Sequence, residues 1–495
     1  MSIGAMMVSL DGMIVVVAQP VLQHELRAGL SQIQWVTNGY LLAVAALLIT
    51  AGKLGDRFGH RRVFLAGVLG FTLSSVAIGL SDGIAWVVGL RALQGVFGAL
   101  MQPATLGLVR NAFPPERLNM PIAVRSSIIA ASTAAGPIVG GLVVEHASWR
   151  WIFFVNVPLG ALALVLGLVG LREVRPDRAA KSFDMPGVVM LAVALCSLVW
   201  GLTRTPAAGG GYGQNLLFLG MATVLGCCFL WWESRVAEPL LPLRIFRSVQ
   251  FSVGAFLTVV LAFVMIGAPF VLVFYLQNVQ HLTPVESGVR VLGLTLMMIV
   301  GAPLVGLWMN RRGARTPIVF GMLATTVAMC ALSRLGASSS SLQIMLCFFV
   351  LGFGFSPVKV GATKLVMSHA PVELSGVAGG IQQTAMQVGG SLGTALIAAI
   401  IGTRVNSTLP RQLSDAGFSL STSQAYEASQ AVAVGQSPGA ALHLGTSDTL
   451  ARIGQAVFLD GMQHALVATA VVAACGTGAA LLIRRGSEQH ADIRV

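Results

Sequence analysis

The sequence is divided into apolar runs of about the length that a helix needs to cross a lipid bilayer. The hydrocarbon core of a bilayer is roughly 30 Å thick, which a helix of about 20 residues spans. Fourteen such runs follow one another, at 3–22, 36–54, 63–80, 84–109, 126–144, 152–171, 185–202, 215–232, 251–275, 289–309, 318–335, 342–361, 377–401 and 461–483. Since backbone polar groups in lipid must be paired within their own segment, we predict an all-α integral membrane protein with 14 transmembrane helices.

The composition excludes a soluble protein. Of the 495 residues, 55% are hydrophobic and 10% are charged, and the mean hydropathy is +0.80. Soluble domains are typically about 25% charged. The net charge of +12 would suggest a nucleic-acid partner in a soluble chain. Here the basic residues have a different explanation, because they collect in the cytoplasmic loops of membrane proteins. We expect no nucleic-acid partner.

The positions of the basic residues predict the orientation of the chain. If the N-terminus lies inside, the cytoplasmic loops and the C-terminal tail hold most of the 31 Lys and Arg residues. The positive-inside rule therefore favours a multi-pass protein of the inner (cytoplasmic) membrane with both termini in the cytoplasm. A miscount by one span would scramble this pattern.

An internal repeat divides the chain into two halves. The segment GKLGDRFGHR, which starts at Gly52, recurs as GLWMNRRGAR, which starts at Gly306, and each copy follows the second span of its half. Paired halves of this kind are typical of transporters that rock about a central site. We predict two pseudo-symmetric six-helix bundles, at 1–171 and 249–485, with two inserted transmembrane helices and their linkers at 172–248. A long outer loop at 404–458 and a cytoplasmic tail at 486–495 complete the organisation.

One acidic residue stands in the middle of the first apolar run. Asp11 has no other charge within that run. A carboxylate at mid-membrane depth costs at least roughly 2.5–3.5 kcal/mol on insertion scales and is rarely without a function. We interpret Asp11 as the proton-coupling group of a membrane transporter.

The loop after the second span has the composition of a gate. Gly52 and Gly59 permit a tight turn between two helix ends. Asp56 and Arg57 can pair with charged helix ends in one conformation and release them in another, with Arg61 close by. The alternative is a basic loop that only fixes the topology.

Several motifs resemble those of one transporter family. GKLGDRFGHRR from Gly52 resembles the loop signature of the major facilitator superfamily, and RALQGVFGA from Arg91 resembles its fourth-helix motif. GPIVGG from Gly136 resembles the fifth-helix motif associated with antiporters. The segment WRWIFFVNVPLG from Trp149, together with Asp11 in the first run, looks like the fourteen-span drug:proton antiporter branch.

This resemblance implies a proton-coupled antiporter that exports lipophilic drugs or toxic compounds by alternating access. It implies that Arg91 acts in proton transfer, the alternative being a fixed ion pair with Asp11. It implies that the protein needs no cofactor, because the proton gradient drives transport. Small residues and a proline in the fifth span permit close helix contact and a kink, and similar motifs are linked to outward exchange: Gly136, Pro137, Gly140 and Gly141. Generic packing is the alternative for these four residues.

Polar side chains in otherwise apolar helices are candidates for the lining of a substrate cavity, since buried amides need partners. They are Asn38, Tyr40, Gln94, Gln102, Gln382, Gln383 and Gln387. No charge occurs from 375 to 403, so we expect small lipophilic substrates that are neutral or monocationic, besides protons and the lipid bilayer. We expect Lys359 and Lys364, near the inner end of the twelfth span, to snorkel.

Other functions find less support in the sequence. The G-x-S-x-G pattern at 79–83 lies between two predicted helices and lacks the strand-to-helix turn that a nucleophile needs. No H-E-x-x-H or P-loop pattern occurs, so we expect neither an enzyme nor a metal site. A dedicated exporter of one endogenous natural product or lipid-linked metabolite is the main alternative. Uptake of a nutrient by proton symport is the third alternative. We expect a monomer.

Overall fold

In the computed structural model, every regular element of the described residues is a helix or a helical turn. The described residues are 2–112, 119–171, 184–203, 213–236, 239, 241, 243–370, 375–418, 421–441 and 448–483. The long helices are α1 (Ser2–Glu25), α2 (Leu30–Phe58), α3 (His60–Gly79), α4 (Ile84–Ala112), α5 (Asn119–His146), α7 (Asn156–Gly170), α8 (Met185–Thr203), α9 (Gly213–Glu233), α10 (Val249–Phe274), α11 (Pro284–Arg312), α12 (Arg315–Leu332), α13 (Ser341–Ser368), α14 (Ser375–Asp415) and α17 (Asp448–Leu481). Three shorter α-helices are α6 (Trp151–Phe154), α15 (Thr422–Ala433) and α16 (Pro438–Ala441).

The prediction of an all-helical, multi-pass membrane protein is confirmed. Among the residues searched, 12 helices are long and apolar enough to cross a membrane. The count of fourteen spans stays a prediction. Two further long helices occupy the positions of the remaining predicted spans: α2 has 29 residues and α5 has 28.

The internal repeat folds into the same turn in both halves. Gly59 ends α2 with a φ of 95°, and Gly313 ends α11 with a φ of 72°. In each turn the glycine N–H donates to the carbonyl four residues earlier, on Gly55 and Met309, at 2.9 Å in both cases. A positive φ favours glycine, which explains why both copies of the repeat carry it at this position.

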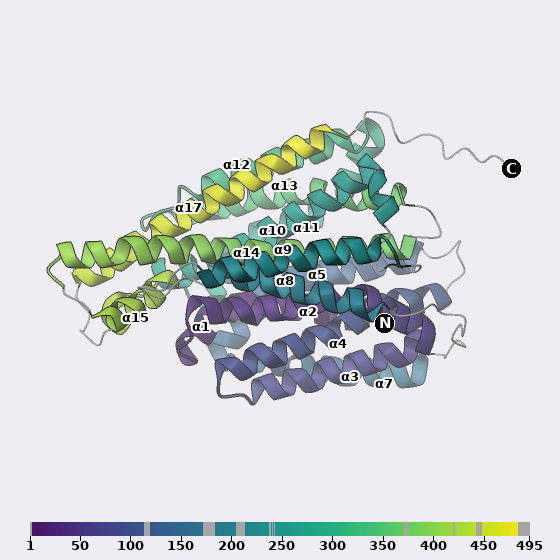
Figure 1. Cartoon of the computed structure of the whole chain (residues 1–495), viewed down its shortest axis with the longest axis horizontal. Helices are drawn as coiled ribbons and strands as arrows, with labels where there is room; N and C mark the ends of the chain where they lie inside the picture. Colours follow the sequence, from purple (N-terminus) through teal and green to yellow (C-terminus); the bar gives the residue numbers. More distant parts are fainter. Residues whose placement is uncertain are drawn as a thin grey trace.

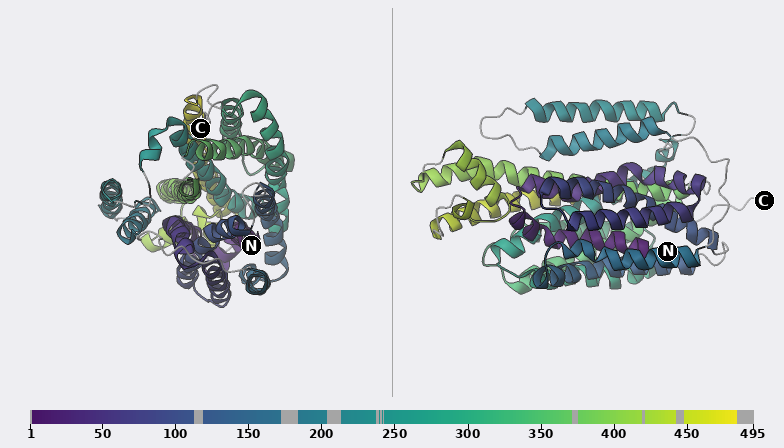
Figure 2. Two further views of the ribbon diagram at one scale, coloured as in Figure 1. Left: turned by 90° about the vertical axis from the view of Figure 1, so that its right-hand side faces the viewer. Right: turned by 90° about the horizontal axis from the view of Figure 1, so that it is seen from below.

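The two halves lie side by side, with α14 between them in the view of Figure 1. Helices α1 to α4 and α7 form one side, and α12, α13 and α17 form the other. The halves meet along two pairs of helices, α2 with α14 and α5 with α11. Figure 2 shows α8 and α9 next to each other outside this bundle. Helix α8 contacts α2 and α14, and the rings of Trp35 and Trp200 lie 5.5 Å apart there.

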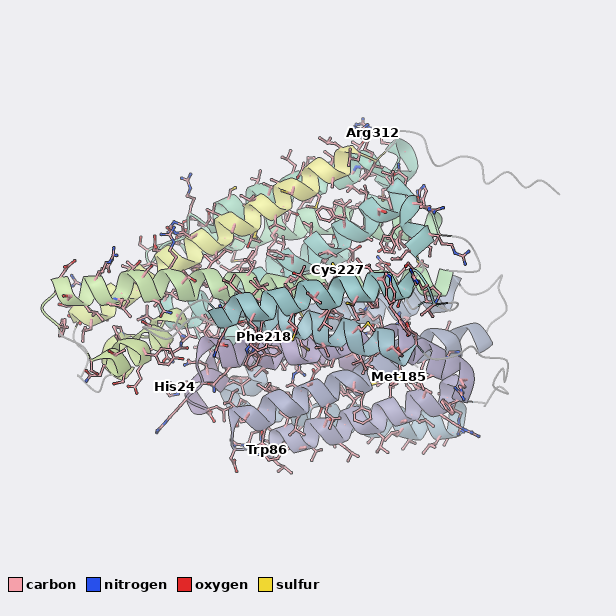
Figure 3. All side chains as sticks on the ribbon, viewed as in Figure 1. His24, Trp86, Met185, Phe218, Cys227 and Arg312 are labelled. Carbon is pink, nitrogen blue, oxygen red and sulfur yellow. The ribbon has the colours of Figure 1, made fainter. Side chains whose placement is uncertain are left out.

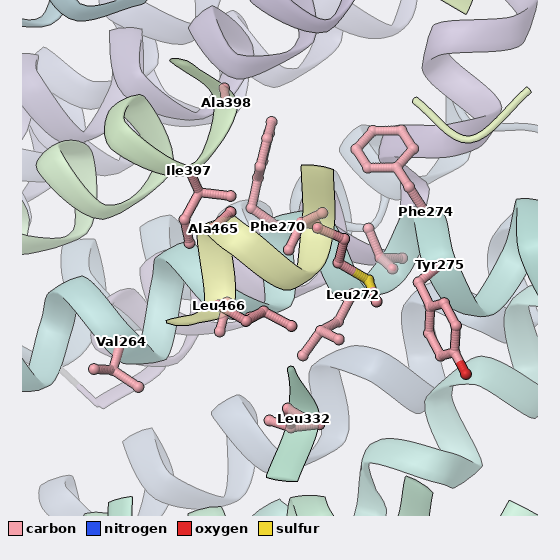
Figure 4. Close-up of a cluster of buried hydrophobic side chains, with 14 of the residues drawn as sticks. Val264, Phe270, Leu272, Phe274, Tyr275, Leu332, Ile397, Ala398, Ala465 and Leu466 are labelled. Atoms are coloured by element: carbon pink, nitrogen blue, oxygen red, sulfur yellow. The ribbon is translucent and has the colours of Figure 1, made fainter. Parts of the chain in front are cut away.

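Apolar side chains both fill the bundle and cover its outside. In the second half, Phe270, Phe274 and Leu466 are at most 1% exposed and pack together in the cluster of Figure 4. Trp86 and Met185, labelled in Figure 3, are 71% and 54% exposed. Large apolar side chains on the outer surface fit contact with lipid, where their exposure to water is removed.

The segment 404–458, predicted as a loop, is mostly helical in its described part. Helix α14 continues to Asp415, α15 and α16 follow, and α17 begins at Asp448. Ser421 caps α15 by accepting a hydrogen bond from the backbone N–H of Gln424. Ala428 and Val432 of the same helix are fully buried. The prediction of a loop was wrong here because alanine-rich sequence forms helix when a cap and a buried face are present.

Candidate functional site

Asp11 lies inside the first half of the bundle and does not face lipid. It is 1% exposed in the middle of α1. Its Oδ2 accepts a hydrogen bond from Nη1 of Arg91 on α4 at 2.5 Å, and the two side chains are 0% and 2% exposed. The two charges of the predicted site therefore form one buried ion pair. Such a pair is stable only when further hydrogen bonds offset the loss of water.

Two amides supply those hydrogen bonds to the carboxylate, and a hydroxyl in turn accepts from both amides. Oδ1 of Asp11 accepts from Nδ2 of Asn156 at 2.9 Å and from Nε2 of Gln94 at 3.2 Å. Both amides also donate to Oγ of Ser75, at 3.1 Å and 2.7 Å. Helices α1, α3, α4 and α7 each contribute one or two side chains to this network, which we call the Asp11 cluster: Asp11, Ser75, Arg91, Gln94 and Asn156.

Arg91 has partners that do not depend on Asp11. Its Nη1 also donates to Oε1 of Gln94 at 2.6 Å, and its Nε donates to the carbonyl of Val36 at 3.2 Å. The guanidinium lies 4.4 Å from the ring centre of Tyr40 and 6.0 Å from that of Phe153. A cation over an aromatic face is attracted by the ring quadrupole. The positive charge thus keeps several contacts if the carboxylate becomes neutral.

Sequence reasoning missed two members of this cluster. Asn156 lies within the motif that starts at Trp149, and an amide in an apolar run before Pro158 is a usable signal. Ser75 carries no such signal, because serine is common in membrane helices. Gln94 and Tyr40, predicted as cavity lining, lie beside Asp11 and Arg91.

The other predicted cavity residues lie at separate places on α14 and its neighbours. Oδ1 of Asn38 accepts from the hydroxyls of Ser391 and Thr394 at 3.1 Å and 2.7 Å, which joins α2 to α14. Gln383 donates to Gln102 at 2.7 Å, which joins α14 to α4. These two contacts therefore lie on the seam between the halves.

The remaining two glutamines of the predicted lining are also on α14. Gln382 donates to Oγ1 of Thr363 on α13. Gln387 is buried, with 9% exposure. The seven predicted residues are thus divided between the Asp11 cluster and its surroundings, the seam and the second half.

The predicted gating loop is a helix end, a one-residue turn and a helix start. Gly52 lies within α2, and Gly59 makes the turn to α3. The side chain of Asp56 lies outside the described residues. Arg57 lies with its guanidinium 5.5 Å from the ring centre of Phe58. Arg61 reaches across to the last turn of α7.

Arg61 donates hydrogen bonds to two carbonyls at the end of α7. Its Nη2 donates to Leu168 at 2.9 Å, and its Nε donates to Gly167 at 3.4 Å. Carbonyls at a helix C-terminus lack partners within their own helix and favour a cation. In this conformation Arg61 therefore fastens α3 to α7.

The four residues of the predicted antiporter motif bring α5 close to two helices. A Cβ on Gly140 would lie 3.2 Å from Cα of Ile14, and one on Gly136 would overlap Met13. On the other side, a Cβ on Gly141 would lie 2.7 Å from the carbonyl oxygen of Pro284 on α11.

Pro137 belongs to the same contact with α11. A Cβ on Gly288 of that helix would lie 2.8 Å from the carbonyl oxygen of Pro137. Helix α5 therefore packs without a gap between the helix that carries Asp11 and the second half of the chain.

Known proteins resemble the chain along most of its length. It is 49% identical over 486 residues to the tetracenomycin C resistance and export protein of Streptomyces glaucescens, which covers 98% of this chain and 90% of that protein. It is 32% identical over 412 residues to the multidrug resistance protein Stp of Mycobacterium tuberculosis, covering 83% and 76%. The puromycin resistance protein pur8 of Streptomyces alboniger is 32% identical over 401 residues, covering 79% and 78%.

The fold also matches a solved structure. A bacterial homologue of the human lysosomal transporter Spinster, in an inward-facing and unoccupied conformation, superposes with a TM-score of 0.65 and 15% identity, covering 97% of this chain and 94% of that one. The model of the Major Facilitator Superfamily matches residues 1–394. The chain therefore belongs to the Major Facilitator Superfamily, as its motifs predicted, which indicates a transporter rather than an enzyme.

Proposed function

We propose that this protein exports small lipophilic compounds across the cytoplasmic membrane in exchange for protons, by alternating access between its two halves. The observation that carries the proposal is the Asp11 cluster. A carboxylate buried in a membrane-crossing helix, held by an arginine and two amides, is a group whose charge changes when it binds a proton.

The cluster has partners for both protonation states of Asp11. While the carboxylate is charged, it pairs with Arg91 and accepts from Asn156 and Gln94. When a proton neutralises it, Arg91 retains Oε1 of Gln94 and the carbonyl of Val36. Binding a proton therefore removes the counter-charge of Arg91 but leaves its guanidinium with two acceptors.

The packing around α5 supports a link between the proton site and the movement of the halves. Helix α1 carries Asp11 and lies directly against Gly136 and Gly140 of α5. Helix α5 also lies against α11 of the second half, at Gly141. Close-packed helices move as units, so a change in the Asp11 cluster that shifts α1 acts on the seam between α5 and α11.

The proposal includes the topology predicted from the sequence. In this proposal the protein has fourteen spans and both termini in the cytoplasm. It is a monomer and is driven only by the proton gradient. In support, Figure 1 shows α1 beginning and α17 ending at the same end of the bundle. The distribution of the basic residues supports the cytoplasmic assignment of that end.

A second candidate is a dedicated exporter of one natural product. The observation in its favour is the 49% identity, over nearly the whole chain, to a protein that exports one named compound, tetracenomycin C. The two candidates share a mechanism and differ in how many substrates pass.

Everted membrane vesicles test the proposal and separate the two candidates. Addition of an exported compound should dissipate a pre-formed pH gradient. The response should disappear in Asp11→Asn and persist in Glu25→Gln, which removes an exposed carboxylate at the C-terminal end of the same helix.

Three results have distinct meanings, two in this assay and one in intact cells. Dissipation by many unrelated compounds supports broad export, and dissipation by a single natural product supports the dedicated exporter. Accumulation inside cells that rises with inward proton flow would show uptake by symport and refute the proposal.

A further inference from the structure

Helix α13 carries a lysine that the proposed proton mechanism does not use. Lys359 lies within α13, nine residues before Ser368 at its end, and is half-buried. Phe355 and Thr363 stand four residues before and after it, so the three side chains share one face. The exposed Phe353 is turned roughly 120° away from this face at 3.6 residues per turn. Lys359 therefore points to the interior and not to lipid.

The ammonium of Lys359 has no charged or hydrogen-bonded partner. Among the described residues it makes no hydrogen bond and no ion pair. Its one electrostatic contact there is with the ring of Phe355, whose centre is 5.5 Å from Nζ. The side chain is half-buried, so the surrounding helices do not enclose it completely. An unpaired charge within a membrane span is costly and marks a functional position.

The interior face of Lys359 favours a role other than snorkelling, which the sequence suggested. About 14 Å of helix separates it from the end of α13, at 1.5 Å per residue. A snorkelling side chain reaches the lipid headgroups along an outer face, and this lysine lies on an inner one.

Hydrogen bonds connect the neighbours of Lys359 to the seam between the halves. Oγ1 of Thr363, on the same face, accepts a hydrogen bond from Gln382 of α14. The next residue, Gln383, donates to Gln102 of α4 in the first half. Transporters built from two repeats bind their substrate at this kind of boundary. In the part of the chain that the structure describes, the groups near this boundary include the ammonium of Lys359, several amides and hydroxyls and the ring of Phe355.

We infer that Lys359 recognises the substrate, and that the substrates include lipophilic anions, meaning aromatic compounds that carry a carboxylate, phenolate or sulfonate. This inference rests on the proposed export function and names its substrate class. A buried ammonium lacks only an anionic oxygen to complete its contacts, and a charge-assisted hydrogen bond is about twice as strong as a neutral one. The carboxylate of Asp11 cannot serve, because Arg91 already holds it. This class differs from the neutral or monocationic substrates predicted from the sequence.

Two fluorescent probes with the same rings test the inference. 1-Anilinonaphthalene-8-sulfonate is an anion, and N-phenyl-1-naphthylamine lacks the sulfonate and is neutral. The dissociation constant of each is measured on the full chain in lipid nanodiscs, with empty nanodiscs subtracted, for the wild type, Lys359→Gln and Lys359→Arg. Lys364→Gln is the matched control, since it removes the same charge from the same helix five residues away.

We expect Lys359→Gln to weaken binding of the sulfonate roughly 10- to 100-fold, the range for one charged hydrogen bond, and to change binding of the neutral probe less than about 2-fold. Lys359→Arg should retain most of the affinity, and Lys364→Gln should retain all of it. Equal weakening of both probes, an unchanged dissociation constant for the sulfonate, or a wild type that does not bind the sulfonate would overturn the inference.

Failure of the export proposal is distinguishable from failure of this inference. The binding measurement is made at equilibrium without a pH gradient, so it does not depend on transport. Selective loss of the sulfonate in Lys359→Gln, together with vesicles that show no proton exchange, would leave the binding site standing and refute proton-driven export.

Discussion

Replacement of Asp11 by asparagine separates the charge of this residue from its shape. An asparagine has one acceptor oxygen and one amide donor in place of two acceptor oxygens. If its oxygen faces Asn156 and Gln94, its amide lies against Nη1 of Arg91, where the present contact is 2.5 Å. If the amide is flipped, it opposes the two amides instead. Either orientation places donor against donor and leaves Arg91 without a counter-charge.

The size of the expected loss follows from the contacts that remain. Removal of one partner of a buried ion pair costs roughly 3–5 kcal/mol. Arg91 keeps Oε1 of Gln94 at 2.6 Å, the carbonyl of Val36 at 3.2 Å and the ring of Tyr40 at 4.4 Å. We therefore expect Asp11→Asn to lower the free energy of unfolding by about 3 kcal/mol, the lower end of that range.

The double variant Asp11→Asn/Arg91→Gln makes the prediction sharper. It removes both charges, so no guanidinium is left unpaired, and at least about 2 kcal/mol of the stability should return. Export should stay absent, because neither variant has a carboxyl group that binds protons. Stability is measured by denaturant unfolding of the purified protein, and proton exchange is measured by dissipation of a pH gradient in everted vesicles.

Two results would refute this reasoning. Full export by Asp11→Asn would show that protons are coupled elsewhere. A double variant that is no more stable than the single one would show that the loss does not come from the unpaired charge of Arg91.

Five further substitutions test the surroundings of Asp11 and the repeated turn. Tyr40→Phe should leave the free energy of unfolding within about 0.5 kcal/mol of the wild type and should leave export unchanged. The buried hydroxyl has no hydrogen-bond partner among the described residues. Tyr40→Leu removes the ring beside Arg91 and should cost at least roughly 1–2 kcal/mol, and equal unfolding curves for the two variants would contradict this. Asn156→Leu should lower stability by about 1.5–3 kcal/mol and reduce export, since a carboxylate oxygen loses a donor, and wild-type values of both would argue against that role. Gly313→Ala should cost about 1–3 kcal/mol through its φ of 72° alone, because no atom lies near the added carbon. Gly306→Ala, also in open space but within α11, should not destabilise, and a similar loss in both would refute the backbone explanation.

Much of the fold follows from the sequence because lipid imposes few solutions. The predicted runs and the long helices agree in position along the chain, since an apolar segment of about 20 residues in a bilayer has to pair its backbone groups as a helix. The repeat located both Gly59 and Gly313, whose positive φ values leave little choice of residue. The segment 404–458 was harder, because its helices depend on a cap at Ser421 and on burial of α15, which involve tertiary contacts.

The candidate site was predictable only where a residue is costly by itself. Asp11 and Arg91 stand out because charges are rare in membrane spans, and the structure brings them together. Asn156 and Ser75 become visible only once α3 and α7 are placed around the carboxylate. The face of α13 that carries Lys359 is hidden for a related reason, since depth along a helix can be read from the sequence but the face that points inward depends on the neighbouring helices.

The repeat that produces the same turns in both halves does not produce the same charges. By the separation of Gly52 and Gly306, the positions that correspond to Asp11 and Arg91 in the second half are Met265 and Met345. Thr105 corresponds to Lys359 in the first half. The first half thus holds a paired acid, and the second half holds an unpaired base on a face that leads to the seam. If protons act in one half and an anionic substrate binds in the other, the two are coupled through the contacts between the halves, and the hydrogen bond between Gln102 and Gln383 is one of those contacts.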